Sequence, residues 1–339
     1  MAATAASLAL PAAARAHPWR RGLLAALGLA LLAAAAVVGW RYAAVPAPYR
    51  YLEPAATQPP AATRIVQVLA ADGERLIAEA EVGGDTVTGP VLLAWRAKID
   101  EPILYLPAPA DEAQALAAVI ARHRQPGVPL LAWWDSSRQL RHFGGGDVFF
   151  DRHLRIPLFV PPAWAGQRAR LEQTEAAFWG EAATPAQRSA FETFTRALVA
   201  PEAEGVRLLR SLVPGGKAIV VLHLRDLLLL GQLHPQQLGV AFQDFADSGD
   251  VHRSVRGVQG WLQQDEHAAY SVIKLPGNLL RAVALRDQAS ADTLAARLLP
   301  LIGNRQDDVA GLTLVFRSGG FSVFELAPAD PPADPPAKP

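Results

Sequence analysis

The 339-residue chain contains no cysteine and has no excess of charge of either sign. Without cysteine it cannot form disulfides, thiolate metal sites, iron–sulfur clusters or a covalently attached c-type haem. Its 32 basic and 32 acidic residues give a formal net charge of zero, which is not typical of a protein that binds nucleic acid through bulk charge. We therefore expect neither a nucleic-acid partner nor a cofactor.

The neutral total hides an uneven distribution of charge along the chain. Five arginines precede the first acidic residue, Glu53, and the remainder holds 27 basic and 32 acidic residues. This pattern indicates a basic, apolar leader joined to a mildly acidic body.

The leader contains residues 22–40, a run of 19 residues without a charge that is mostly Leu, Ala, Val and Gly. As a helix this run would be roughly 28 Å long, which is enough to cross the hydrocarbon core of a bilayer. Aromatic residues and arginines flank it on both sides, and the arginines before it favour a cytoplasmic N-terminus. We predict a transmembrane anchor over residues 22–42 that contacts the lipid bilayer, after a cytoplasmic tail over residues 1–21.

Two other interpretations of the leader stay open. A cleaved signal peptide needs a small-x-small triplet just after the apolar run, where Tyr42 and Pro48 interrupt the candidates. A buried helix of a soluble fold would leave the basic and aromatic flanks unexplained. The anchor is therefore the favoured interpretation.

The rest of the chain divides by composition. Residues 43–63 are rich in Pro and Ala and predict a semi-extended spacer, and residues 327–339 predict a disordered Pro-rich tail. The folded body is expected over residues 64–326, either as one unit or as two subdomains that meet near residues 165–215.

Within the body, short apolar runs alternate with amphipathic stretches. The predicted strands are residues 75–82, 91–95, 103–106, 128–134, 156–160, 217–223, 268–274, 280–286, 312–317 and 321–326. The predicted helices are residues 110–124, 167–179, 185–199, 202–212, 226–231, 251–264 and 289–299. Helices between apolar strands suggest βαβ crossovers, and Gly319-Gly320 joins the last two strands in a hairpin. The predicted fold class is therefore α/β: a mixed sheet with flanking helices and a C-terminal β-hairpin, preceded by one N-terminal transmembrane helix.

The most distinctive stretch begins where the strand predicted over residues 128–134 ends. In open α/β sheets, ligands bind beyond the carboxyl ends of the strands. Trp133 and Trp134 could stack on a ligand or pack against a partner, Asp135 could accept hydrogen bonds or bind a cation, and Arg138 could hold an anion. The structural alternative is that the tryptophans pack in the core and over a helix end while Asp135 caps a helix. We take Trp133, Trp134, Asp135 and Arg138 as the candidate binding residues.

Other motifs do not reach the pattern that their chemistry requires. The glycine run at residues 144–146 lacks the ending of a P-loop, and the eight histidines show no HExxH spacing. There is no Gly-x-Ser-x-Gly turn, and Asp244, Asp247 and Asp250 do not follow the EF-hand pattern. We therefore predict no catalytic residue and no metal site, and we favour a non-enzymatic protein over an enzyme.

Several segments carry a resemblance to a known family. They are the apolar leader, LLAWWDSSRQLRHFGG, AAFWG, AIVVLHLRDLLLLGQLHPQQLGVAFQDF, WLQQDEHAAYSV and LVFRSGGFSVFEL. Together they resemble the hydroxylamine oxidation accessory protein family, whose members are encoded beside a multihaem hydroxylamine oxidoreductase in ammonia oxidisers and some methane oxidisers. The resemblance implies a single-pass protein of the bacterial inner membrane, with a periplasmic body that supports or docks this oxidoreductase. It implies no catalytic residues.

A second, three-residue likeness leaves another function open. Trp133-Trp134-Asp135 is similar to the WWD signature of the oligosaccharyltransferase catalytic subunit, where the motif helps to recognise the acceptor Ser or Thr. One predicted span contrasts with the many spans of that family, so we do not expect a complete glycosyltransferase. The alternatives are a periplasmic glycan- or peptide-binding domain, or a small hydrolase with a metal held by Asp135 and nearby histidines such as His142 and His153.

Overall fold

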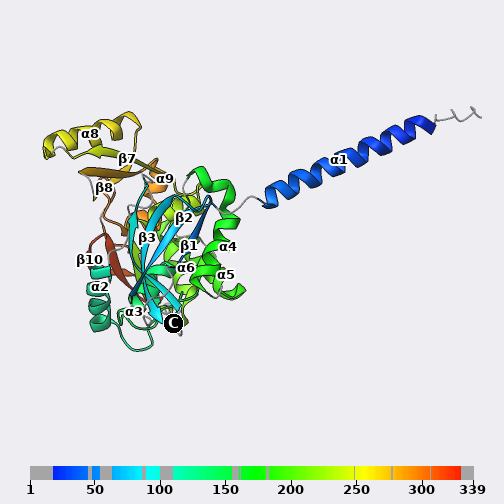
Figure 1. Ribbon diagram of the computed structural model, residues 1–339. Helices are drawn as coiled ribbons and strands as arrows, with labels where there is room; N and C mark the ends of the chain where they lie inside the picture. Colours follow the sequence, from blue (N-terminus) through cyan, green and yellow to red (C-terminus); the bar gives the residue numbers. More distant parts are fainter. Residues whose placement is uncertain are drawn as a thin grey trace, which may run out of the picture. The chain divides into compact units, whose positions relative to one another are not determined.

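The computed structural model describes residues 18–44, 48–53, 63–85, 89–99, 110–154, 160, 162–180, 183–247, 249–275, 278–305 and 307–329. The chain forms two compact units, residues 1–46 and residues 47–339. The described part of the first unit is the helix α1 (Pro18–Ala44), drawn in blue in Figure 1, and its Leu24 and Leu29 side chains are exposed. Across the described ranges, the helices lack the combination of length and apolarity needed to cross a membrane. The transmembrane anchor over residues 22–42 stays a prediction.

The second unit begins with an antiparallel sheet of four strands in the order β1-β2-β3-β4. Its strands are β1 (Tyr49–Leu52), β2 (Thr63–Ala70), β3 (Leu76–Asp85) and β4 (Gly89–Ala97). The sequence predicted β3 and β4 but neither β1 nor β2. The strand β1 lies within the stretch expected to be a spacer, and its Tyr49 side chain is fully buried.

The central sheet is mixed, with the strand order β10-β11-β6-β5. Its strands are β5 (Leu130–Leu131), β6 (Ala218–His223), β10 (Leu312–Ser318) and β11 (Phe321–Leu326). Strand β6 pairs in parallel with β5 and antiparallel with β11. The C-terminal hairpin is confirmed, and both of its turn residues, Gly319 and Gly320, have the positive φ angles that this turn requires.

Helices cover both faces of the central sheet. Alternate residues of β6 pack against α2 (Ala110–His123) on one face and against the α5 side of the core on the other. The helices between β5 and β6 are α3 (Trp134–His142), α4 (Arg168–Trp179), α5 (Pro185–Val199) and α6 (Glu202–Leu212), and α7 (Asp226–Leu233) follows β6. Short 3-10 turns, η2 (Pro162–Gln167) and η3 (Pro214–Gly216), precede α4 and β6. This arrangement confirms a mixed α/β fold.

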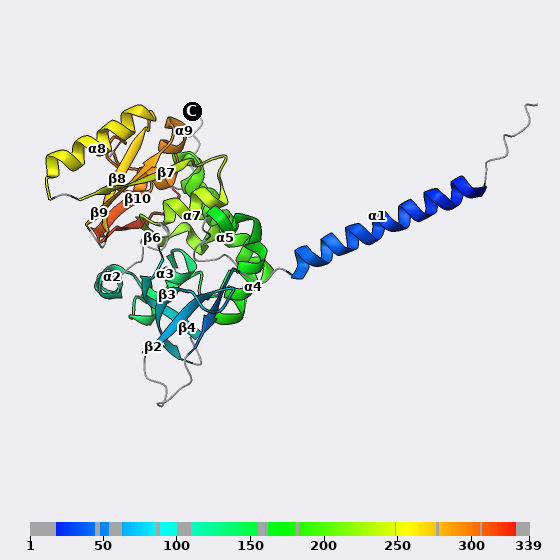
Figure 2. The same ribbon diagram turned by 45° about the horizontal axis from the view of Figure 1, so that its top comes forward.

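A third, antiparallel sheet has the order β7-β9-β8 and lies beside α8 (Val251–Gln264), as Figures 1 and 2 show. Its strands are β7 (Val240–Ala246), β8 (Ala269–Leu275) and β9 (Leu279–Leu285). One side of α8 packs against the sheet through Val258 and Leu262. The strand β7 is not among the strands predicted from the sequence.

Two sequence predictions about element bounds are wrong. The strand expected over residues 128–134 is only β5, because the amide of Ser137 already bonds the carbonyl of Trp133 and the chain turns into α3. The helix expected over residues 289–299 is divided into α9 (Gln288–Ala291) and α10 (Leu294–Leu298). Asp287 caps α9 by accepting a hydrogen bond from the amide of Ser290.

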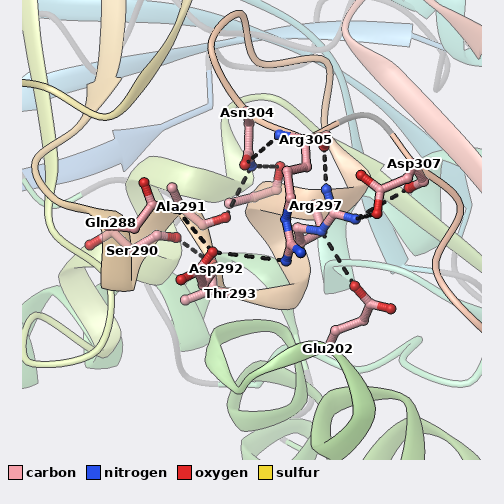
Figure 3. Close-up of polar contacts among 11 residues, drawn as sticks. Glu202, Gln288, Ser290, Ala291, Asp292, Thr293, Arg297, Asn304, Arg305 and Asp307 are labelled. Atoms are coloured by element: carbon pink, nitrogen blue, oxygen red, sulfur yellow. Dashed lines mark hydrogen bonds and ion pairs between the residues drawn. The ribbon is translucent and has the colours of Figure 1, made fainter.

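Polar contacts around a buried arginine of α10 hold the loop that follows this helix (Figure 3). The Arg297 side chain has no exposed surface, and its Nε lies 3.3 Å from Glu202 Oε2 of α6. The same guanidinium donates to the carbonyl of Arg305 and lies 3.0 Å from Asp307 Oδ2. Asn304 donates to the carbonyls of residues 291 and 296. These contacts fasten the loop after α10 to α6, α9 and α10.

Some expectations lie outside the described residues. These are residues 1–17 of the cytoplasmic tail, residues 45–47 and 54–62 of the spacer, the strand over residues 103–106, most of the strand over residues 156–160, and residues 330–339 of the C-terminal tail. The subdomain boundary near residues 165–215 stays a prediction.

Candidate functional site

Both tryptophans of the candidate site are buried. The Trp133 and Trp134 side chains are 1% exposed and belong to the largest apolar cluster of the described residues. The Trp133 ring contacts Phe191 edge to face, with 5.0 Å between ring centroids. The Trp134 ring contacts His153 in the same way, at 4.6 Å. In this conformation neither ring is available to stack on a ligand at the surface.

Arg138 is also buried, and it bonds to backbone carbonyls of three separate segments. Its Nε donates to the carbonyl of Asp151 at 2.8 Å, and its Nη1 donates to the carbonyls of Trp179 at 2.8 Å and Pro90 at 3.2 Å. Its guanidinium lies 5.2 Å from the centre of the Trp134 ring. Burial, reinforced by the nearby Arg141, lowers the pKa of Arg138 to about 10. These bonds connect α3 to β4, to the segment after α3 and to the end of α4.

Asp135 does not cap α3. The first residue before α3 is Trp133, and no side chain accepts a hydrogen bond there. Instead Asp135 Oδ2 accepts a hydrogen bond from Arg225 Nη2, which also donates to Ser136 Oγ at 3.1 Å. Asp135 Oδ1 is buried and has no hydrogen-bond partner within the part of the chain that the structure describes.

Arg225 and its neighbours follow β6, which pairs in parallel with β5. Their polar groups therefore meet those of α3 at the carboxyl ends of the two strands, where ligands bind in open α/β sheets. We call this group the carboxyl-edge cluster: Asp135, Ser136, His223, Arg225 and Asp226.

Two groups of the carboxyl-edge cluster have strongly shifted pKa values. Asp226 Oδ2 accepts a hydrogen bond from the amide of His223 at 2.9 Å, and its Oδ1 lies 3.8 Å from Arg225 Nε. Burial raises the pKa of Asp226 to about 7, against the opposing effect of Arg225. Burial and the charge of Arg225 lower the pKa of His223 to about 3. Near neutral pH the histidine is therefore uncharged, and the aspartate is partly protonated.

A second buried polar group connects β1 to α4. The Glu175 side chain has no exposed surface and accepts hydrogen bonds from Tyr49 Oη at 2.7 Å and from Tyr51 Oη at 3.0 Å. Trp179 Nε1 donates to Tyr51 Oη at 3.2 Å, and His153 Nε2 lies 3.6 Å from Glu175 Oε2. Burial and the Glu175 charge raise the pKa of both tyrosines well above its ordinary value.

Neither group was predicted in full from the sequence. Both tyrosines lie in the stretch assigned to the spacer, so nothing pointed to their burial. Arg225 and Asp226 follow a buried apolar strand, and this position was a usable signal. To place these two residues beside Asp135, however, one must know that β5 and β6 are parallel neighbours.

The three aspartates near α8 have structural partners. Asp244 forms a bidentate ion pair with Arg281 at 2.7 Å, Asp247 lies 3.1 Å from Lys274 Nζ, and Asp250 caps α8. Across the described residues, no group of three or more His, Asp or Glu side chains is placed to hold a metal ion.

These observations define a mixed α/β protein with three sheets and a buried ionic cluster at the carboxyl edge of its central sheet. The family model described as HaoA-associated protein HaoB matches residues 19–326, and the chain belongs to this family. Membership implies an association with hydroxylamine oxidoreductase, and it confirms the family resemblance of the sequence. Neither a curated protein nor a solved structure matches the chain.

Proposed function

We propose that the protein is a membrane-anchored, non-enzymatic accessory protein that supports or docks a multihaem hydroxylamine oxidoreductase. Its body would lie in the periplasm, outside the bacterial inner membrane. The observation that carries this proposal is the family match, which covers residues 19–326 and so includes almost the whole leader helix and body. The absence of cysteine supports a division of labour in which covalently attached haem belongs to the partner.

The internal contacts of the candidate site favour an accessory role over catalysis. Arg138 bonds to three carbonyls, Asp135 pairs with Arg225, and Trp133 lies in the core. A catalytic or glycan-binding site needs polar groups that converge on an accessible pocket. The alternative of a glycan- or peptide-binding WWD site therefore has no observation in its favour beyond the three-residue likeness.

The docking proposal is tested by co-purification. The full-length tagged chain is expressed in its native membrane and solubilised in mild detergent, and multihaem oxidoreductase in the eluate is measured by its haem absorbance. We expect enrichment over an eluate from cells with an untagged chain. Equal haem in both eluates would contradict the proposal.

The anchor is supported by the uncharged run at residues 22–40 and its aromatic and arginine flanks. We expect the wild-type chain to stay in membranes washed with alkaline carbonate. Exchanging both Leu29 and Leu32 for arginine adds about 2.5–3.5 kcal/mol per charge to insertion at a helix centre and should release the chain. The matched control exchanges the same leucines for valine. Release of the wild-type chain would contradict the anchor.

The periplasmic location is tested separately. Protease added to intact spheroplasts should digest the body, while a cytoplasmic marker protein stays whole. Protection of the body until the cells are lysed would contradict this location.

A further inference from the structure

A groove of about 480 Å³ lies between α4, α5 and α7, which Figure 2 shows next to one another. Its floor consists of the buried side chains of Leu154, Phe191 and Thr195. Thr195 Oγ1 donates a hydrogen bond to the carbonyl of Glu192 and lies 3.0 Å from His234 Nε2. The polar atoms of the floor therefore already have partners, and the groups that can meet a ligand lie at the rim.

The rim of the groove carries two arginines and two glutamates. Arg168 and Glu172 lie on α4, and Arg168 Nε is 3.3 Å from Glu172 Oε1. Arg188 and Glu192 lie one turn apart on α5. No ion pair links Arg188 or Glu192 to another of the described residues. A positive and a negative group are therefore both available to a ligand.

The electric field in the groove favours an anion beside the arginines. Burial lowers the pKa of His234, and the charges of Arg196 and Arg168 lower it further. The same charges that disfavour a protonated histidine attract a negative group. The guanidinium of arginine suits a phosphate in particular, and the carboxylate of Glu192 suits an ammonium. The rim therefore fits a zwitterion in which a phosphate and an ammonium are joined by a short linker.

The proposed anchor limits how far this side of the body can lie from the bilayer. Six residues separate residue 42, where the predicted anchor ends, from Tyr49 of β1, and this stretch can span at most about 25 Å. The Tyr49 ring contacts Trp164 of η2, with 5.7 Å between ring centroids. Arg168 begins α4 four residues after Trp164. The rim of the groove therefore belongs to the part of the body where the chain enters from the anchor.

We propose that this groove binds the headgroup of a phospholipid from the membrane that holds the anchor, with the phosphate on Arg188 and the ammonium on Glu192. Phosphoethanolamine is the headgroup that carries both charges. Arg168, which is held by Glu172, supplies a second guanidinium at the same rim. The inference rests on the proposed membrane anchor and deepens it, because it assigns the side of the body that faces the bilayer. It does not depend on the docking of an oxidoreductase.

The first test uses glycerophosphoethanolamine, the soluble headgroup of such a lipid. It is titrated into the full-length chain in a detergent without phosphate, and binding is followed by phosphorus NMR. We expect saturable binding to the wild-type chain. Arg188→Gln should bind about tenfold more weakly, because it loses a hydrogen bond between two charged groups. Since detergent replaces the bilayer, this measurement does not depend on whether the leader anchors the chain.

Glu192→Gln distinguishes recognition of the ammonium from a general effect on the fold. It should weaken the binding of glycerophosphoethanolamine about threefold, as expected for a partly screened ion pair. It should strengthen the binding of glycerophosphate, which has no ammonium, because a negative charge leaves the rim. The matched control is Arg207→Gln, which removes an exposed arginine of α6 paired with Glu204 and should leave both affinities unchanged. Circular dichroism checks that each variant is folded.

The second test asks whether the headgroup belongs to the bilayer. Because the chain has no cysteine, Ser189→Cys and Gln263→Cys each provide a single site for a fluorophore. Position 189 is exposed beside Arg188 on α5, whereas position 263 is exposed on α8, which lies apart from α5 in both views (Figures 1 and 2). In vesicles whose lipids carry a nitroxide on the headgroup, the label at position 189 should be quenched more strongly than the label at position 263.

Three results would overturn the proposal. They are headgroup binding that does not saturate, equal binding by folded Arg188→Gln and Arg207→Gln, and quenching at position 263 that is as strong as at position 189. The first two leave the anchor standing if the chain stays in carbonate-washed membranes. Headgroup binding in detergent by a chain that carbonate releases would instead refute the anchor, and with it the lipid as the source of the headgroup.

Discussion

Arg225, in the turn after β6, pairs with Asp135 of α3, although the two residues are 90 positions apart in the sequence. The contact joins the carboxyl ends of the parallel strands β5 and β6, and the side chains are 12% and 6% exposed. An ion pair at this depth loses most of its hydration, so the two charges depend on each other.

Arg225→Met should therefore lower the free energy of unfolding by about 3–5 kcal/mol, because it leaves Asp135 charged and buried without its partner. The double variant with Asp135→Leu should recover much of this loss. The matched control is Arg207→Met, which breaks an exposed ion pair with Glu204 and should cost at most about 1 kcal/mol. Urea unfolding measures all three, and equal losses for Arg225→Met and Arg207→Met would contradict the prediction.

His223 and Asp226 predict opposite dependences of stability on pH. Burial raises the pKa of Asp226 from 3.8 to about 7 and lowers the pKa of His223 from 6.5 to about 3. Asp226 therefore stabilises the fold below about pH 4, and this contribution is lost as the pH rises toward 7. The contribution of His223 is present above about pH 6.5 and is lost as the pH falls toward 3. Between about pH 4 and about pH 6.5, the contributions of Asp226 and His223 to the free energy of unfolding change in opposite directions and offset each other in the wild-type chain.

Single substitutions should separate the two effects. In His223→Gln, stability should fall as the pH rises from about 4 to about 7, by about 1.4 kcal/mol per pH unit relative to the wild-type chain. In Asp226→Asn, stability should fall by a similar slope as the pH drops from about 6.5. Urea unfolding at fixed ionic strength measures both slopes. If stability changed with pH in the same direction in both variants, the opposite pKa shifts of His223 and Asp226 would be contradicted.

Glu175→Leu should lower the free energy of unfolding by about 3 kcal/mol, because it leaves the hydroxyls of Tyr49 and Tyr51 buried without their acceptor. The control is Glu172→Leu on the same helix, where the carboxylate pairs with Arg168 at a partly exposed position. Thermal unfolding followed by circular dichroism compares the two. A loss as large in the control would assign the effect to α4 as a whole rather than to the tyrosine contacts.

Arg297→Met should loosen the loop after α10, because it removes the group that bonds Glu202, the carbonyl of Arg305 and Asp307. We expect a loss of about 3 kcal/mol, as is typical when one partner of a buried ionic group is removed. Limited proteolysis should then cut within residues 300–309 at lower protease concentration than in the wild-type chain. The control Arg305→Met lies at an exposed position 4.0 Å from Asp292 and should change neither measurement. Unchanged proteolysis of Arg297→Met would contradict this account.

The variant Trp134→Ala distinguishes a packing role of this tryptophan from a role in docking the oxidoreductase. The Trp134 ring is 1% exposed and contacts His153, Trp179 and Arg138, so its removal should cost about 3–5 kcal/mol of stability. At a temperature where the variant is still folded, we expect hydroxylamine oxidoreductase to co-purify with it as with the wild-type chain. Loss of co-purification from the folded variant would make Trp134 part of a docking surface.

Local patterns explain why some elements could be predicted to the residue. The bounds of α5, α6, α8 and β11 agree with the sequence analysis. The helices carry amphipathic periodicity, and α5 also has its cap within reach: Thr184 and Gln187 form a capping box at its start. Signals of this kind involve residues only a few positions apart, so they do not depend on how the rest of the chain folds.

Elements defined by distant partners could not be found in this way. The strand β1 is only four residues long and has prolines nearby, and it becomes a strand through pairing with β2 and burial of Tyr49 against α4. The carboxyl-edge cluster has the same origin, since Asp135 and Arg225 meet only because β5 and β6 are neighbours. Asp135 was a candidate from the sequence, whereas Arg225 joins it only through the pairing of the two strands.

The position of β6 has a consequence for amide hydrogen exchange. All six of its residues are buried, strands flank it on both sides, and its side chains contribute alternately to two apolar clusters. Opening either cluster alone leaves the strand covered by the other. The amides of β6 that bond to β5 and β11 should therefore exchange with solvent only when the whole body unfolds, which makes them a direct measure of its global stability.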